Sequence, residues 1–91
     1  MADKTFNLEI LTTRHTIFRG EVVSLVAPGA LGYLGVWANH APLVTTLTAG
    51  KITARDASGA VRVLQAKGSG FLEVFKNQAT VLIDEVDEGA A

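Results

Sequence analysis

The sequence predicts an all-β protein, a sandwich or a barrel built from roughly eight to ten short strands. No stretch of the chain repeats apolar residues at helical spacing, whereas alternation of apolar and polar residues with a period of two is common. Turn-forming Gly, Pro, Asn and Asp residues interrupt this alternation at short intervals. The 91 residues are enough for one small domain.

The first expected strand is residues 6–10, where apolar residues alternate with polar ones. Residues 16–27 form a second strand region that is rich in β-branched residues, with Gly20 as a bulge or bend. Pro28 and Gly29 are expected to form the next turn, because Pro fixes its own φ and Gly accepts a positive φ.

The middle of the chain is expected to continue with short strands. Residues 32–37 contain two strand pieces and end at a turn of Ala38 and Asn39, since Asn tolerates the left-handed conformation. Residues 43–47 form either a strand or one turn of helix, and Gly50 ends them.

The last part of the chain contains four further strands in two hairpins, residues 51–55, 60–66, 71–75 and 79–83. The connections are the short loop "DASG", a break at "KGSG" and the turn "KNQ". We therefore expect one β domain over residues 1–84, followed by an acidic, flexible tail over residues 85–91.

The composition favours a protein with a binding surface for other proteins. Charged residues make up 19 % of the chain, against roughly 25 % in ordinary globular domains, and hydrophobic residues make up 48 %. Such an excess predicts an exposed apolar patch of the kind that marks a partner surface. The net charge of −1 and the lack of a basic stripe argue against nucleic-acid binding. The absence of Cys excludes thiolate chemistry and Cys-ligated zinc, and we expect no cofactor and no metal.

The run from Val22 to Gly50 contains no Asp, Glu, Lys or Arg. Its length would permit a membrane span, but its Pro, Gly and Asn residues would break a helix and leave backbone groups unpaired in lipid. No direct membrane insertion is therefore expected. Trp37, the only tryptophan, lies in this run and serves either core or rim packing or the anchoring of an interface.

The two histidines do not predict an active site. His15 lies in a polar turn. His40 would need a carboxylate to orient it and a nucleophile to activate, and no acid occurs between Glu21 and Asp56. We predict no catalytic residue, and His40 is left with a structural role in a turn or a contact to a partner.

Two stretches, "GYLGVWANHAPLVTTLTAG" and "GSGFLEVFKNQATVLID", resemble the N-terminal domain of the epsilon subunit of the F-type ATP synthase. Nearly the whole chain is covered by this resemblance, including the opening "LEILTTRHTIFRGEVVSLVAPG". The resemblance implies a flattened β-sandwich of about ten strands. It also implies a non-catalytic rotor subunit, peripheral on the cytoplasmic face of the energy-coupling membrane, that helps couple proton flow to ATP synthesis.

The partners that the resemblance implies are the gamma subunit and the c-ring. The positions that match the gamma-facing side of the family are Thr12, His40 and Thr45, and those that match its c-ring loop are Leu31, Gly32, Tyr33 and Leu34. Tyr33 stands where many members carry an acid, and Ala38 replaces the usual Pro of the turn.

Many members of this family continue into a C-terminal helical hairpin that can inhibit hydrolysis and bind ATP. Without that hairpin we expect no ATP binding by this chain. Two other functions remain open from the residues alone: a free-standing β-sandwich module that binds a small ligand in an aromatic groove, and a small hydrolase that uses His40.

Overall fold

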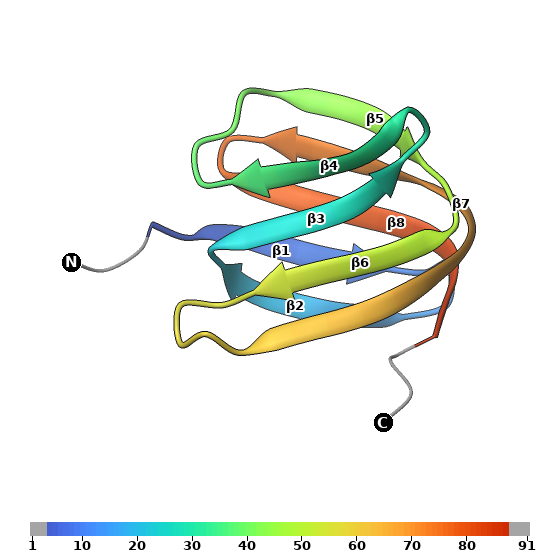
Figure 1. Ribbon diagram of the computed structural model, residues 1–91, viewed down its shortest axis with the longest axis horizontal. Helices are drawn as coiled ribbons and strands as arrows, with labels where there is room; N and C mark the ends of the chain where they lie inside the picture. The colour runs from blue at the N-terminus through green and yellow to red at the C-terminus, as the bar shows by residue number, and fades with distance from the viewer. Residues whose placement is uncertain (1–3, 88–91) are drawn as a thin grey trace.

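The computed structural model describes residues 4–87, which contain eight strands and no helix (Figure 1). The strands are β1 (Phe6–Leu11), β2 (Thr16–Val22), β3 (Ser24–Gly29), β4 (Gly32–Trp37), β5 (Leu43–Leu47), β6 (Gly50–Arg55), β7 (Val61–Phe75) and β8 (Gln78–Asp87). Within these residues there is accordingly no helix that could span a membrane.

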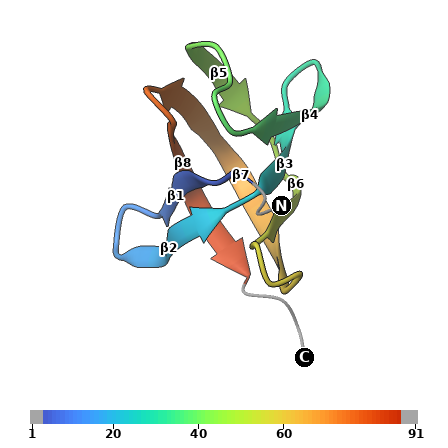
Figure 2. The ribbon, with the colours of Figure 1, turned by 90° about the vertical axis from the view of Figure 1, so that its left-hand side faces the viewer.

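The eight strands form one hydrogen-bonded sheet that folds over into two layers (Figure 2). The first layer, called here the β3 layer, contains β4, β3, β6 and the first half of β7. The second, the β8 layer, contains β5, the second half of β7, β8, β1 and β2. All pairings are antiparallel except that of β1 with β8. The predicted all-β sandwich is confirmed.

The count of eight strands, rather than about ten, follows mainly from β7. This strand runs through the "KGSG" stretch where a break was expected, pairing with β6 before it and with β5 after it. Gly68 has a φ of 81°, and the register against β8 shifts between Lys67 and Gly70. These glycines therefore form a bulge that bends β7 from one layer to the other, and the chain does not reverse.

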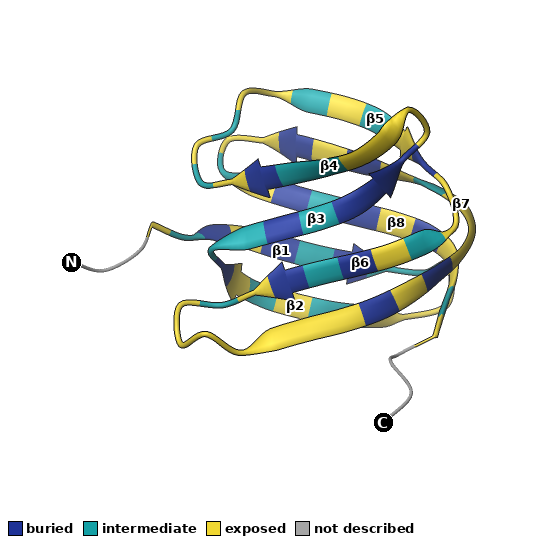
Figure 3. Cartoon of the chain, in the orientation of Figure 1, coloured by how far each residue is buried: buried dark blue, intermediate teal, exposed yellow. Residues whose placement is uncertain are grey.

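The core lies between the two layers and is entirely apolar in the described residues. The alternation expected for the first strand is observed, since Phe6, Leu8 and Ile10 are buried while Asn7 between them is exposed. The same alternation buries Leu72 and Val74 of β7 and Val81 and Ile83 of β8, which belong to the same β8 layer. Leu25 of β3 and Ile52 of β6 are the buried residues that meet them from the β3 layer. Figure 3 shows buried and exposed segments alternating along the strands. Packing of the inner faces accounts for the sandwich.

The turn predicted at Pro28 and Gly29 is wrong by two residues. Both residues belong to β3, where Gly29 pairs with Gly32, and the turn is made by Ala30 and Leu31. Pro28 is tolerated because it lies near the end of the strand, where its carbonyl accepts a hydrogen bond of 2.8 Å from the backbone of Thr48.

Gly20 does not form the predicted bulge. It pairs in register with Leu8, and the irregularity of this hairpin lies between Ile10 and Leu11. A Cβ atom on Gly20 would come within 3.3 Å of the Phe18 ring, so the glycine leaves room for that ring. The expected strand over residues 16–27 is also two strands, divided at Val23.

The turns predicted at Asn39, in the "DASG" loop and at "KNQ" are confirmed. Asn39 has a φ of 64° and Gly59 of the "DASG" loop a φ of 91°. Lys76 and Asn77, between β7 and β8, have φ values of 49° and 61°. Two successive left-handed residues are typical of a type I′ turn, whose twist matches that of the strands it connects. Residues 43–47 form a strand and not a helical turn.

The predicted tail begins too early. Strand β8 continues to Asp87, so that residues 85–87 pair with β7 and belong to the sandwich. Lys67 forms an ion pair of 2.9 Å with Asp87, which places an acid of the supposed tail against the sheet. The remaining residues of the predicted tail, 88–91, lie outside the described residues.

Candidate docking surfaces

The four positions predicted to face a ring lie together at one corner of the sandwich. Leu31 is fully exposed at the tip of the β3–β4 turn, and Gly32 opens β4 immediately after it. Tyr33 follows with 61 % of its surface exposed, whereas Leu34 is half-buried and packs against the core. The corner therefore presents Leu31 and Tyr33 outward, and Leu34 holds the turn to the sandwich.

Tyr33 is fixed on this corner by its hydroxyl group. Its Oη accepts a hydrogen bond of 2.9 Å from the backbone N–H of Lys51 at the start of β6. Gly50 is the residue that permits this contact, since a Cβ atom there would lie 2.7 Å from both the Tyr33 hydroxyl and a carbon of Pro28. The hydroxyl proton of Tyr33 remains available to a partner's acceptor.

Thr12, the first of the positions predicted to face a gamma subunit, follows β1 and stabilises its own turn. Its Oγ1 accepts hydrogen bonds from the backbone N–H groups of Arg14 and His15, at 3.2 and 3.3 Å. This local bonding is the usual role of a Thr at a turn. Thr12 is half-buried, and Thr13, Arg14 and His15 beside it are exposed.

His40 lies half-buried in the loop between β4 and β5. Its Nδ1 lies 2.7 Å from the carbonyl oxygen of Ala41, and because a carbonyl can only accept, Nδ1 carries the proton. Within residues 4–87 this is the ring's only hydrogen bond, and these residues contain no cluster that could hold a metal. The carboxylate that a hydrolase based on His40 would need is not bonded to the ring.

The three positions predicted to face a gamma subunit do not form one cluster. His40 lies just before β5, at the end of the sandwich that carries the turn between β7 and β8 with Asn77. Thr12 follows β1 and lies at the opposite end. The five paired residues of β1 between these ends correspond to about 17 Å of strand. Thr45 lies between them on β5, half-buried between the exposed Val44 and Thr46.

Sequence reasoning missed an apolar strip on the outer face of the β8 layer. We call this the outer strip, and its exposed members are Val44, Phe71, Phe75 and Leu82. Phe71 is paired directly with both Thr46 and Leu82, and next to it lies a shallow hollow of about 180 Å³. Glu73 lies within the strip beside Val44, and two charges lie at its edges, Lys76 over the ring of Phe75 and Asp84 at the hollow next to Phe71.

A signal for the outer strip is present in the sequence. In "LVTTL", "FLEVF" and "TVLID", apolar residues occupy both phases of the alternation. Strands that are covered on one face alone show apolar residues in one phase, and those covered on both faces show them in both. The pattern therefore indicated a second covered face on β5, β7 and β8.

Residues 5–89 match the family of the ATP synthase delta/epsilon chain, β-sandwich domain. An ATP synthase epsilon chain of Syntrophomonas wolfei is 38 % identical over 90 residues, covering 99 % of this chain and 65 % of the relative. The ATP synthase epsilon chain of Moorella thermoacetica is 41 % identical over 83 residues, covering 91 % of this chain and 61 % of the relative. The chain thus spans somewhat less than two thirds of these relatives. An epsilon chain of Chlorobium limicola is covered over 96 % of its length at 38 % identity.

Two solved structures share the fold. A chain in the mitochondrial ATP synthase of Euglena gracilis, determined with its c-ring, superimposes with a TM-score of 0.86 over 96 % of this chain and 55 % of its own length, at 18 % identity. A chain in the central stalk and c-ring of the Tetrahymena thermophila mitochondrial ATP synthase superimposes with a TM-score of 0.76 at 11 % identity. The match covers 97 % of the chain described here and 69 % of the Tetrahymena chain. At these identities the likeness establishes the sandwich fold.

Proposed function

The chain belongs to the family of the ATP synthase delta/epsilon chain, β-sandwich domain, and from this premise we propose that it is a non-catalytic subunit of the central stalk of an F-type ATP synthase. In this role it links the gamma subunit to the c-ring and helps to couple proton flow to ATP synthesis. It is then peripheral to the energy-coupling membrane, on its cytoplasmic face. The family match over residues 5–89 carries this proposal.

The outer strip supports a gamma subunit as one partner. Burial of a Val, Leu or Phe side chain contributes about 1.5–3 kcal/mol, so four such side chains on one face can drive stable association. The candidate contact Thr45 lies on the same strand as Val44 of the strip, but its side chain belongs to the opposite face of β5. We propose the strip as a gamma-facing surface, and Thr12, His40 and Thr45 as further contacts to gamma at separate places on the sandwich.

The corner of Leu31 and Tyr33 supports the c-ring as the other partner. The corner lies in the run from Val22 to Gly50, which contains no charged residue. Docking against the polar loops of a c-ring would therefore not remove any charged side chain of this corner from water. Tyr33 offers an aromatic face and a hydroxyl proton. We propose that the ring contact here depends on packing and one neutral hydrogen bond.

The test is co-elution of the chain with the matching gamma subunit under native conditions. Val44→Ser is the variant and Val63→Ser the control, since both valines are exposed, at 70 % and 42 %, but lie on different layers. We expect Val44→Ser to weaken the complex by about tenfold, the effect of one lost apolar contact of roughly 1.4 kcal/mol. Val63→Ser should leave the affinity unchanged.

Two results would contradict the proposal. If the unmodified chain does not co-elute with gamma, the stalk function is wrong. If the two serine variants weaken the complex equally, the outer strip is not the gamma-facing surface, although the function can stand. His40→Ala provides a further check: we expect it to weaken the complex more than it lowers the thermal stability of the isolated chain.

A further inference from the structure

Trp37 lies on the outer face of the β3 layer, because its neighbour Val36 on β4 is buried and successive side chains of a strand point to opposite faces. The β3 layer and the β8 layer are the two sides of the sandwich (Figure 2), so Trp37 is on the side away from the outer strip. Its side chain is 59 % exposed. A Cβ atom on Gly35 would come within 2.5 Å of the six-membered ring of the indole, so this end of the side chain lies over the glycine, against the sheet. Core packing, one of the roles expected of Trp37, is therefore wrong: the ring packs on an outer face, and a large part of it is open to a partner.

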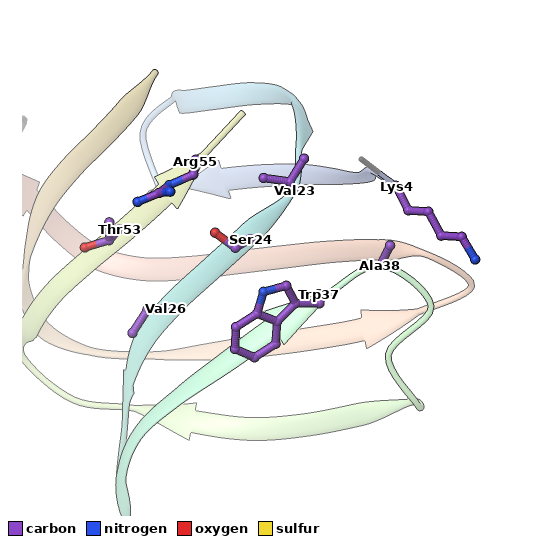
Figure 4. Close-up of a pocket in the computed structure, with 8 residues that line it drawn as sticks. All are labelled: Lys4, Val23, Ser24, Val26, Trp37, Ala38, Thr53 and Arg55. Carbon is purple, nitrogen blue, oxygen red and sulfur yellow. The ribbon is translucent and has the colours of Figure 1, made fainter. Parts of the chain in front are cut away.

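The indole forms the floor of a shallow groove of about 570 Å³ (Figure 4). The residues that line it are Lys4, Val23, Ser24, Val26, Trp37, Ala38, Thr53 and Arg55. Ser24 pairs with Trp37 on one side and with Arg55 on the other, so these three residues form one row across β4, β3 and β6. The row places an aromatic ring, a hydroxyl and a guanidinium side by side.

The charge of the groove is entirely positive. Its two charged residues, Lys4 and Arg55, form no ion pair within residues 4–87, and no acidic side chain lines the groove. Figure 4 shows the two cations on either side of the indole. Since neighbouring strands are about 4.8 Å apart, Arg55 lies two strands and roughly 10 Å from Trp37 across the sheet.

We propose that this groove docks an acidic segment of a partner polypeptide, with an apolar side chain placed on Trp37 and carboxylates placed near Arg55 and Lys4. A single small anion cannot reach cations on opposite sides of the ring at once. A peptide with acids flanking an apolar residue matches both the spacing and the sign of the charge. Trp and Arg are also the residue types that contribute most to protein–protein binding when a partner covers them.

This inference does not rest on the stalk function, because it concerns the β3 layer and not the gamma-facing side. The probe is an amidated hexapeptide, EELFEE, labelled with a fluorophore and titrated with the full chain while its anisotropy is measured. KKLFKK is the peptide of opposite charge, and EEGSEE lacks the apolar centre. We expect binding of EELFEE that weakens with added NaCl, and little or no binding of the other two.

Variants of the chain locate the binding. Arg55→Gln and Lys4→Gln should each weaken EELFEE binding by about two- to fivefold, as expected for one exposed charge pair, and Trp37→Ala should weaken it further. Lys51→Gln is the control, since Lys51 is an exposed lysine that does not line the groove. Because Trp37 is exposed, its replacement should leave the fold intact, which circular dichroism verifies.

Three outcomes would overturn the proposal. The first is that EELFEE does not bind even at millimolar concentration. The second is that Lys51→Gln and Arg55→Gln weaken EELFEE binding equally. The third is that inorganic phosphate or ATP displaces the peptide when present at a lower concentration than the peptide. The last would assign the groove to small anions. A normal complex with gamma alongside any of these would leave the proposed function standing.

Discussion

Asn77 is expected to hold together three segments of the chain, and its replacement tests how they are joined. The residue is the second of the turn between β7 and β8 and has a φ of 61°. Its Oδ1 accepts a hydrogen bond of 2.8 Å from the backbone N–H of Asn39, and its Nδ2 donates one of 2.9 Å to the carbonyl of Thr5. One side chain thus ties the loop before His40 and the start of β1 to this turn.

The structure predicts a graded series of losses. Asn77→Gly keeps the left-handed backbone but removes both hydrogen bonds, each worth about 0.5–1.5 kcal/mol, so the free energy of unfolding should fall by about 1–3 kcal/mol. Asn77→Ala should lose roughly 1 kcal/mol more, because a Cβ atom disfavours positive φ. Asn77→Asp keeps the acceptor for Asn39 but places a carboxylate oxygen against the carbonyl of Thr5, with no proton between the two acceptors. It should therefore lose at least as much stability as Asn77→Gly, although one hydrogen bond remains.

The measurement is equilibrium unfolding in urea at neutral pH, followed by Trp37 fluorescence and by circular dichroism. Gln78→Ala is the control, since Gln78 is the exposed neighbour and its side chain makes no hydrogen bond within residues 4–87. It should change stability by less than about 0.5 kcal/mol. If Asn77→Gly matches the unmodified chain within that margin, the two hydrogen bonds do not stabilise the fold and the reasoning is wrong.

Further predictions concern the core, the bulge and the "DASG" loop. Leu72→Ala should lower the free energy of unfolding by about 2–5 kcal/mol, because the side chain is fully buried; a smaller loss in urea titrations would argue against the core described here. Gly70→Ala should destabilise more than Gly59→Ala in the same assay, since its Cβ would lie 2.0 Å from a backbone oxygen of β8, whereas a Cβ on Gly59 meets open space and is disfavoured only by the φ of 91°; the reverse order would contradict the bulge geometry. The hydrogen bond from Ser58 lowers the pKa of Asp56 below its ordinary 3.8, so its ionised form adds stability at neutral pH that is lost as pH falls through the lowered pKa. Asp56→Asn should therefore lose less stability than the unmodified chain on acidification, and identical pH profiles would show that the loop does not contribute.

The sequence by itself determined the fold class, most strand positions and the chemistry of several turns. Alternation at Phe6, Leu8 and Ile10 is enough to assign a buried face, because successive side chains of a strand point to opposite sides. The left-handed backbone of Asn39 was predictable from its residue type. Family membership was also visible in the motifs around His40, and the match over residues 5–89 confirms it.

Only the tertiary structure decided how these elements meet. A glycine permits a turn, a bulge or a close approach equally well, so the sequence could not tell that Gly68 bends a continuous strand and that Gly20 makes room for a ring. Residues 85–87 are acidic enough to suggest a tail, yet their pairing with β7 keeps them in the sheet.

The two candidate surfaces depend on tertiary structure for the same reason. Phe71 and Leu82 become neighbours only through the register of β7 with β8, and Trp37 and Arg55 only because β3 lies between their strands. Local pattern fixes which face of a strand a side chain occupies, because that depends on backbone geometry alone. Which strand lies alongside is a long-range choice, made when the two layers close over the core, and that choice determined both surfaces.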